Sequence, residues 1–149
     1  MDLETDIKRI EQRTEQQAKS NWAFRRFLKD SELPAREIDS VVHALSQEVS
    51  NQIDCMRCAN CCKTISPLLK PRDIQRLARH LNMSDADFQA QYLQKYEEED
   101  GEVFGEAPCP FLKENRCTVY SSRPDDCRFY PHLHKRDFVS RVGQAIFNC

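Results

Sequence analysis

Hydrophobic residues recur at helical spacing between positions 38 and 53, and this is the most regular pattern in the chain. The apolar residues of the segment follow one another at intervals of 3, 1, 3, 4 and 4 positions: Ile38, Val41, Val42, Leu45, Val49 and Ile53. Residues three and four apart lie on one face of an α-helix, so the pattern predicts an amphipathic helix that leads directly into Cys55. Pro34 precedes this segment and suits its first helical turn.

Residues 3–29 form a second candidate helix, because they are rich in the helix formers Glu, Gln, Lys, Arg and Ala. An apolar stripe begins at Ile7 and Ile10 and resumes only near the end of the segment, at Trp22, Phe24, Phe27 and Leu28. The polar middle predicts a helix that is solvated or packs over only part of its length.

Two short helices are predicted after the first cysteines. Residues 73–81 carry four apolar side chains on one face: Ile74, Leu77, Ala78 and Leu81. Ser84 followed by Asp87 is typical of a helix cap, and it precedes Phe88 on the next helical face. The acidic run from Glu97 to Glu102 indicates a solvated loop.

The region from Pro108 onward consists of short apolar segments broken by prolines, which is typical of a metal-organised lobe rather than a regular sheet. Leu, Ile, Val and Phe make up 33 of 149 residues, just above the roughly 20% below which chains tend toward disorder. The hydrophobic core is therefore thin for the length. We predict a mainly α fold, with a small helical region over residues 1–53 and an irregular, cysteine-rich metal-binding domain over residues 54–149.

Charge and hydropathy exclude several classes of protein. The chain has 22 basic and 24 acidic residues, a net charge of −2, which argues against a dedicated nucleic-acid binder. No run approaches the roughly 20 apolar residues that cross a bilayer, and Met1–Asp6 is polar rather than an apolar signal segment. We therefore expect a cytoplasmic protein without membrane contact. Cysteines in a reducing compartment seldom form structural disulfides, so a secreted disulfide framework is the less favoured alternative.

The eight cysteines are the candidate metal-binding residues of the chain. The first four form the pattern C-x2-C-x2-C-C, and the remaining four are dispersed, so that the candidate metal ligands are Cys55, Cys58, Cys61, Cys62, Cys109, Cys117, Cys127 and Cys149. Two intervening residues let a tight loop turn two thiolates onto one metal centre. A distant cysteine followed by proline completes such sites in ferredoxins, and Cys109-Pro110 has that form.

Adjacent cysteines leave the number of centres open. The side chains of Cys61 and Cys62 are expected to diverge, so the two serve different centres or one of them is not a ligand. Eight thiolates would fill two four-cysteine sites, and one cluster with several free cysteines is the next possibility. Cys149 is the weakest candidate because it is the last residue.

These motifs together resemble the YkgJ-like, or CxxCxxCC, family of zinc- or iron-chelating proteins. The resemblance runs from Cys55 to Cys149 and rests on the C-x2-C-x2-C-C group, on Cys109-Pro110-Phe111-Leu112, on Cys117-Thr118-Val119-Tyr120 and on Arg123-Pro124-Asp125-Asp126-Cys127-Arg128-Phe129-Tyr130-Pro131. The family carries eight characteristic cysteines, and each has a counterpart here. The resemblance implies a metal site and does not cover the first 50 residues.

The flagellin lysine N-methylases are similar through the same cysteine region and are associated with an iron–sulfur cluster. They are much longer enzymes, and this chain has only three glycines, Gly101, Gly105 and Gly143, with no Gly-rich site for a methyl donor. We therefore carry over the metal site alone and expect no independent catalytic activity and no catalytic residue. A cluster-dependent enzyme subunit related to these methylases remains the alternative. A further hypothesis is a metal carrier or an adaptor that docks an unknown protein partner through the helix from Ile7 to Leu28.

Iron–sulfur and zinc both accept thiolate ligands, so ligand type does not decide between them. A cluster tolerates dispersed ligands more easily than one ion does, which favours an iron–sulfur cluster over a zinc-binding structural or adaptor protein. His132 and His134 could enter a mixed site but are not needed among so many thiolates. Arg123 and Arg128, together with Lys63, are expected to offset thiolate charge and donate hydrogen bonds near sulfur.

Overall fold

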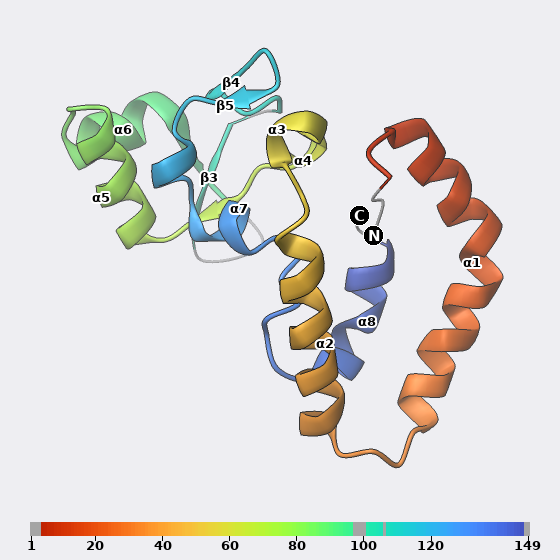
Figure 1. Ribbon diagram of the computed structural model, residues 1–149. Coiled ribbons are helices and arrows are strands. Elements are labelled where there is room, and N and C mark those ends of the chain that lie inside the picture. The colour runs from red at the N-terminus through yellow and green to blue at the C-terminus, as the bar shows by residue number, and fades with distance from the viewer. Residues whose placement is uncertain (1–3, 97–100, 106, 148–149) are drawn as a thin grey trace. The chain divides into compact units, whose positions relative to one another are not determined.

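The computed structural model describes residues 4–96, 101–105 and 107–147 (Figure 1). The fold is mainly α, as the sequence predicts. The helices are α1 (Ile7–Asp30), α2 (Ala35–Ser50), α3 (Cys55–Cys58), α4 (Asn60–Thr64), α5 (Pro71–His80), α6 (Asp85–Tyr92), α7 (Asp125–Phe129) and α8 (Phe138–Phe147), with one 3₁₀ turn, η1 (Tyr120–Ser122). The strands are short: β1 (Leu68–Leu69), β2 (Leu93–Lys95), β3 (Glu102–Phe104), β4 (Leu112–Lys113) and β5 (Arg116–Cys117).

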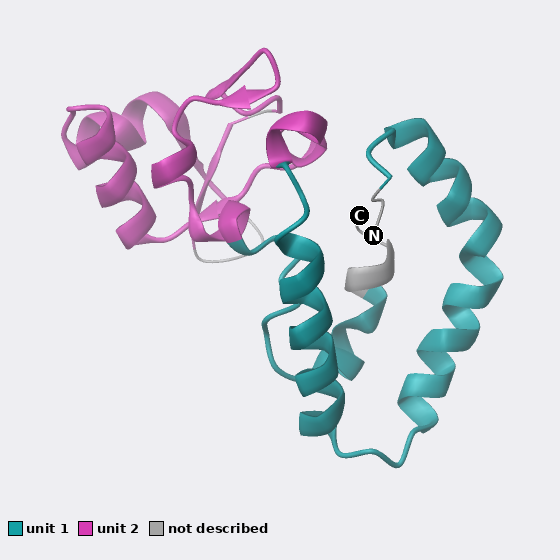
Figure 2. Cartoon of the chain, viewed as in Figure 1, with its two compact units in different colours: residues 1–54, 129–149 teal, residues 55–128 magenta. Residues whose placement is uncertain are grey.

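The chain divides into two compact units (Figure 2). Unit 1 takes the chain up to Asp54 and again from Phe129 onward, and unit 2 takes residues 55–128 without interruption. Unit 2 is thus inserted in sequence between the two parts of unit 1. The predicted division into 1–53 and 54–149 stays a prediction.

Unit 1 is built from α1, α2 and α8, with α8 in contact with both other helices. Among the side chains that the structure describes, its core is small and contains Ile38, Phe138 and Val142. The ten-residue helix α8 lies where the sequence analysis expected irregular structure. The spacing of Phe138, Val139 and Val142 matches one helical face and was a usable signal for it.

Helix α2 confirms the strongest periodic pattern but differs from it at both ends. It ends at Ser50, so Ile53 lies beyond the helix and is 50% exposed. Pro34 occupies the N-cap position rather than the first turn. Of the predicted face, Ile38 is buried, whereas Val41 is exposed. The pattern fixes the helix, but the small core of unit 1 covers only part of its apolar face.

Helix α1 has no buried residue along its 24 positions. Its aromatic side chains Trp22, Phe24 and Phe27 are 55%, 48% and 66% exposed. The inward positions include Thr14, a polar residue whose hydroxyl donates to the carbonyl of Ile10, 2.9 Å away. The predicted partial packing of this helix therefore agrees with its exposure, and docking of a protein partner on it stays a prediction.

Asp39 of α2 caps the N-terminus of α8. Its carboxylate accepts hydrogen bonds from the backbone N–H groups of Asp137, at 2.8 Å, and Phe138, at 2.9 Å. Asp39 is only 8% exposed, and these bonds cross 98 and 99 positions of sequence. The hydrogen bond from Phe138, followed by that from Asp137, lowers the pKa of the Asp39 carboxyl below its ordinary value of 3.8, against the opposing effect of burial.

Replacing Asp39 by asparagine is expected to lower the free energy of unfolding by about 1 kcal/mol at neutral pH, because hydrogen bonds to an ionised carboxylate contribute more than hydrogen bonds to a neutral amide oxygen. Because the folded pKa is lowered, the carboxylate stabilises the fold above pH 3.8 and loses this contribution as the pH falls through the lower, folded pKa. Urea unfolding of Asp39→Asn and wild type between pH 2 and pH 7 measures this: the two should converge at the acid end. A constant gap over the whole range would contradict the assignment.

Unit 2 packs α5 and α6 with a three-stranded antiparallel sheet of order β1-β3-β2. Both helices confirm the sequence prediction, and the Ser84 hydroxyl caps α6 by accepting from the N–H of Asp87 at 3.1 Å. The core of the unit consists of Leu69, Ile74, Leu77, Ala78, Phe88, Phe104, Phe111 and Val119. Phe111 stacks on Phe88 with ring centroids 6.3 Å apart, so this core directly supports the segment that follows Cys109.

The predicted acidic loop is only partly described. Residues 97–100 lie outside the described residues, and Glu102 belongs to β3 rather than to a loop. Its carboxylate accepts a hydrogen bond from the side-chain amide of Gln89 at 2.8 Å. This pairing with α6 explains why an acidic residue is accommodated in the sheet.

Candidate metal centre

Six cysteines of unit 2 line one small cavity of about 50 Å³. They come from α3, α4, the segment before β4, β5 and α7, and they are Cys55, Cys61, Cys62, Cys109, Cys117 and Cys127. Cys58 is half-buried and is not among the lining residues. Cys149 lies outside the described residues. The structure therefore brings six of the eight predicted ligands to one cavity, and the ligand role of every one of the eight stays a prediction.

The first cysteine group turns at Ala59, between α3 and α4. Ala59 has φ 53°, in the left-handed region, and is 3% exposed against the cavity. Its N–H donates to the carbonyl of Cys55 at 2.8 Å, which closes the turn of α3. The reversal lets α4 start in a new direction, so that Cys61 and Cys62 reach the same cavity as Cys55.

Cys109 and Cys117 are held by backbone hydrogen bonds to the rest of the unit. The N–H of Cys109 donates to the carbonyl of Cys62 at 2.8 Å, which joins the dispersed cysteines to the first group. Cys117 lies on β5 and pairs with Leu112 of β4 across a two-stranded antiparallel ribbon. The ribbon therefore determines the position of Cys117 relative to Cys109.

Cys127 is positioned through a buried carboxylate of α5. Asp73 is 1% exposed, and its carboxylate accepts from the N–H groups of Lys70 and Asp125, both at 3.0 Å, and from the guanidinium of Arg76. Arg76 in turn donates to the carbonyl of Arg123 at 2.9 Å and to the Asp125 carboxylate at 3.1 Å. These bonds form a clamp, Asp73 with Arg76, that fixes the start of α7 and hence the position of Cys127.

The sequence analysis did not single out this clamp. Asp73 and Arg76 are a common i, i+3 pair on a helix, and nothing local shows that their partners lie 46 to 52 positions further along. A second long-range hydrogen bond was equally absent from the sequence analysis. The Asp126 carboxylate accepts it from the N–H of Leu68 at 3.1 Å. The sequence signal for these contacts was the acidic pair Asp125 and Asp126 beside Cys127, but such a pair is also typical of the first turn of any helix.

The thiols of the cavity influence one another. The side chains of Cys61 and Cys62 do not diverge as expected: both residues line the cavity, and the Cys62 thiol hydrogen-bonds to the Cys61 sulfur. This bond lowers the pKa of Cys61 to about 6 and raises that of Cys62. Burial, followed by the charges of neighbouring cysteines, raises the pKa of Cys127 to about 12. Burial also raises the pKa values of Cys109 and Cys117. Ionising most of these thiols therefore requires a compensating cation, and a coordinated metal supplies one.

The remaining wall of the cavity is largely apolar. Phe104, Phe111 and Val119 are buried and line it, and Tyr120 lies at the exposed side. Phe129, which follows Cys127 in the motif that resembles the family, is 46% exposed and falls in unit 1. His132 and His134 also fall in unit 1, with ring centroids 6.1 Å apart. The cavity wall is thus formed largely by sulfur and hydrocarbon; five of its thiols are half-buried, and that of Cys55 is exposed to solvent.

Arg123 is the cation that lines the cavity. Its guanidinium lies over the Tyr120 ring, 3.8 Å from the centroid, and Nη1 donates to the Tyr120 carbonyl at 2.9 Å. Its Nε is buried and has no hydrogen-bond partner among the described residues. An unsatisfied buried donor costs about 1–3 kcal/mol. A cluster of thiols beside a buried N–H donor on a cation is a donor set that fits an anionic metal–thiolate centre.

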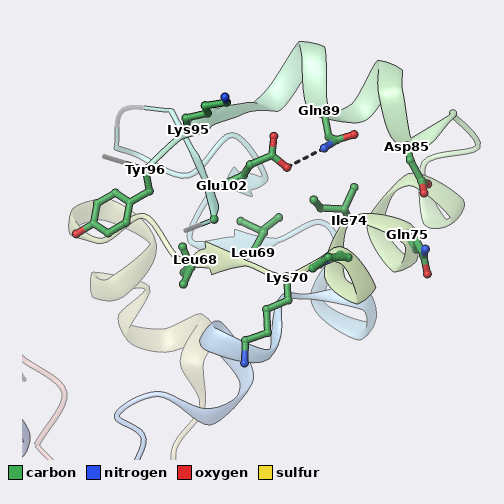
Figure 3. Close-up of a pocket in the computed structure, with 12 residues that line it drawn as sticks. Leu68, Leu69, Lys70, Ile74, Gln75, Asp85, Gln89, Lys95, Tyr96 and Glu102 are labelled. Atoms are coloured by element: carbon green, nitrogen blue, oxygen red, sulfur yellow. Dashed lines mark hydrogen bonds between the residues drawn. The ribbon is translucent and has the colours of Figure 1, made fainter. Parts of the chain in front are cut away.

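Among the described residues, no group of three His, Cys, Asp or Glu side chains has the geometry to hold a single metal ion. A larger cavity of about 560 Å³ lies between α5, α6 and the three-stranded sheet (Figure 3). It is lined by Leu68, Leu69 and Ile74 with a polar rim that includes Lys95 and Glu102, and no cysteine or histidine lines it. The cysteine cavity is therefore the candidate metal centre.

A small helical protein with one cavity walled by thiols is the architecture of a cysteine-based metal chelator. The CxxCxxCC family, described as "Putative zinc- or iron-chelating domain", matches residues 54–144 of the chain. The chain belongs to this family. No curated protein and no solved structure matches it significantly. No helix in the described part of the chain is both long and apolar enough to cross a membrane.

Proposed function

We propose that the chain binds an iron–sulfur cluster through the thiols of the cysteine cavity, in a structural or redox role. One observation carries the proposal: six cysteines line a single cavity of about 50 Å³. A tetrahedral zinc ion takes four ligands, so six thiols exceed what one ion uses. A cluster of several irons accepts thiolates that arrive from different directions.

The chain's own residues would hold and shield the cluster. Cys55, Cys61 and Cys109 arrive from three different segments, an arrangement that a polynuclear centre accepts. Phe104 and Phe111 exclude water from one side, and burial of the sulfurs tunes the potential of such clusters. When bound, the cluster supplies the ability to take up or release an electron. Each thiol must lose its proton to bind, so uptake of the cluster should release protons and should weaken at acidic pH.

The proposal is tested by purifying the full chain anaerobically and measuring iron, acid-labile sulfide and zinc per chain together with the visible absorption spectrum. We expect iron and sulfide in equal amounts and a broad charge-transfer absorption that bleaches on reduction. Treatment with an iron chelator under mild acid should remove both, because ligand protonation competes with the metal. A colourless chain that retains zinc after anaerobic purification would overturn the cluster and favour a zinc-binding structural protein.

A further inference from the structure

Arg123 differs from Lys63 and Arg128 because, among the described residues, it is the cationic residue that lines the cavity. Lys63 and Arg128 are exposed and do not line it. The known contacts of Arg123 account for Nη1, which donates to the Tyr120 carbonyl, and for the flat face of the guanidinium, which covers the Tyr120 ring. They leave Nε, the nitrogen nearest the chain, buried and without an acceptor in the described part of the protein.

The surroundings of Nε determine what kind of acceptor suits it. The cavity is lined by six cysteines, by Phe104, Phe111 and Val119, and by few other polar groups. Sulfur is therefore the acceptor that the walls of the cavity offer. Because guanidinium stays charged at all relevant pH values, the group brings a permanent positive charge as well as a donor.

We propose that Arg123 donates its Nε–H to a sulfur of the centre bound in the cysteine cavity and thereby stabilises the more negatively charged state of that centre. This inference rests on the proposed function, because it assumes a metal–thiolate centre in this cavity. Two contacts position Arg123. Its guanidinium lies over the Tyr120 ring, and its backbone carbonyl accepts a hydrogen bond from Arg76 at 2.9 Å. Hydrogen bonds to cluster sulfurs and nearby charge are established determinants of reduction potential.

The test compares the full chain carrying Arg123→Gln, which removes the charge and the guanidinium, with Arg123→Lys, which keeps only the charge. The matched control is Arg116→Gln, the same substitution at an exposed arginine beside Cys117 that does not line the cavity. The midpoint potential of each anaerobically purified protein is measured by redox titration followed in the visible spectrum. Iron and sulfide per chain are measured in parallel.

For Arg123→Gln we expect an approximately tenfold weaker preference for the reduced state, a midpoint about 59 mV more negative for a one-electron couple. Arg123→Lys should fall between this variant and wild type, and Arg116→Gln should match wild type. A purely structural role for Arg123 would lower the amount of folded, loaded protein without moving the midpoint of what remains. An unchanged midpoint in both Arg123 variants would therefore overturn the inference. If Arg123→Gln does not fold, Arg123→Lys carries the same test.

Failure of the proposed function can be distinguished from failure of the inference about Arg123. If wild type holds zinc without sulfide, the cluster proposal fails, and the inference about Arg123 is tested by chelator competition for zinc. Arg123→Gln should then bind zinc about tenfold more weakly than wild type, because the anionic thiolates lose their cation. Equal zinc affinity of Arg123→Gln and Arg116→Gln would overturn the inference in that case as well.

Discussion

Replacing Cys61 by serine is expected to reduce metal retention about 100-fold and to destabilise unit 2. The hydrogen bond from the Cys62 thiol lowers the pKa of Cys61 to about 6, so Cys61 ionises readily for coordination. A serine hydroxyl is a hard, weakly acidic group and a poor ligand for iron in a cluster or for zinc. Loss of second-shell partners alone typically costs 10- to 100-fold in metal affinity, so loss of a direct ligand should reach the upper end of that range.

Metal content per chain and urea unfolding, measured on the same anaerobic preparations, check this result. Asn115→Gly is the matched control, because it changes a cavity-lining residue that carries no sulfur and sits at a positive φ of 63° that glycine accepts. Cys58→Ser is a second variant to compare. The sequence motif predicts the same loss of metal for it, although Cys58 does not line the cavity. Full metal content in Cys61→Ser would show that the cavity is not the metal site.

Replacing Asp73 by asparagine is expected to lower the free energy of unfolding of unit 2 by about 3 kcal/mol. The carboxylate is 1% exposed and accepts three hydrogen bonds, including one from Arg76. Asparagine keeps one acceptor, but its NH2 group then opposes either the N–H of Lys70 or that of Asp125, two donors facing each other. Arg76 also loses its buried carboxylate partner and keeps only the more exposed one of Asp125, which adds to the cost.

Urea unfolding of the loaded protein, followed by circular dichroism, measures the loss. Asp85→Asn is the matched control, since Asp85 is exposed in the first turn of α6 and contributes at most about 0.5 kcal/mol through the helix dipole. The clamp also sets the position of Cys127, so Asp73→Asn should release metal faster on dilution into chelator. Equal stability of Asp73→Asn and Asp85→Asn would contradict the structural role of the clamp.

Local pattern predicted those parts of the structure that depend on neighbours in sequence. The apolar spacing predicted helices α2 and α5, and the cap residue Ser84 predicted where α6 begins. The cysteine spacing indicated a metal-binding family, which residues 54–144 confirm. In each case the interacting residues lie within a few positions of each other, so the physical cause is visible in the sequence itself.

The parts that could not be predicted depend on long-range contacts or on backbone direction. The Asp39 cap joins α2 to α8 across 98 positions, and no local pattern marks either partner. Spacing placed the first four cysteines together but could not show that Ala59, with φ 53°, would redirect the chain between them. That turn decides which thiols line the cavity, and Cys58 is not one of them. Arg123 was noted for its charge, whereas its buried Nε required the folded structure.

The discontinuous make-up of unit 1 has a consequence for the order of events during synthesis. Residues 55–128 leave the ribosome as one complete piece, while α2 must wait for Phe138 and Val142 to be translated before its core can close. Contiguous domains generally fold as they emerge. The cysteine cavity can therefore form before the second part of unit 1 has been made. The capping of α8 by Asp39 has to follow, because Asp137 and Phe138 are translated after residues 55–128.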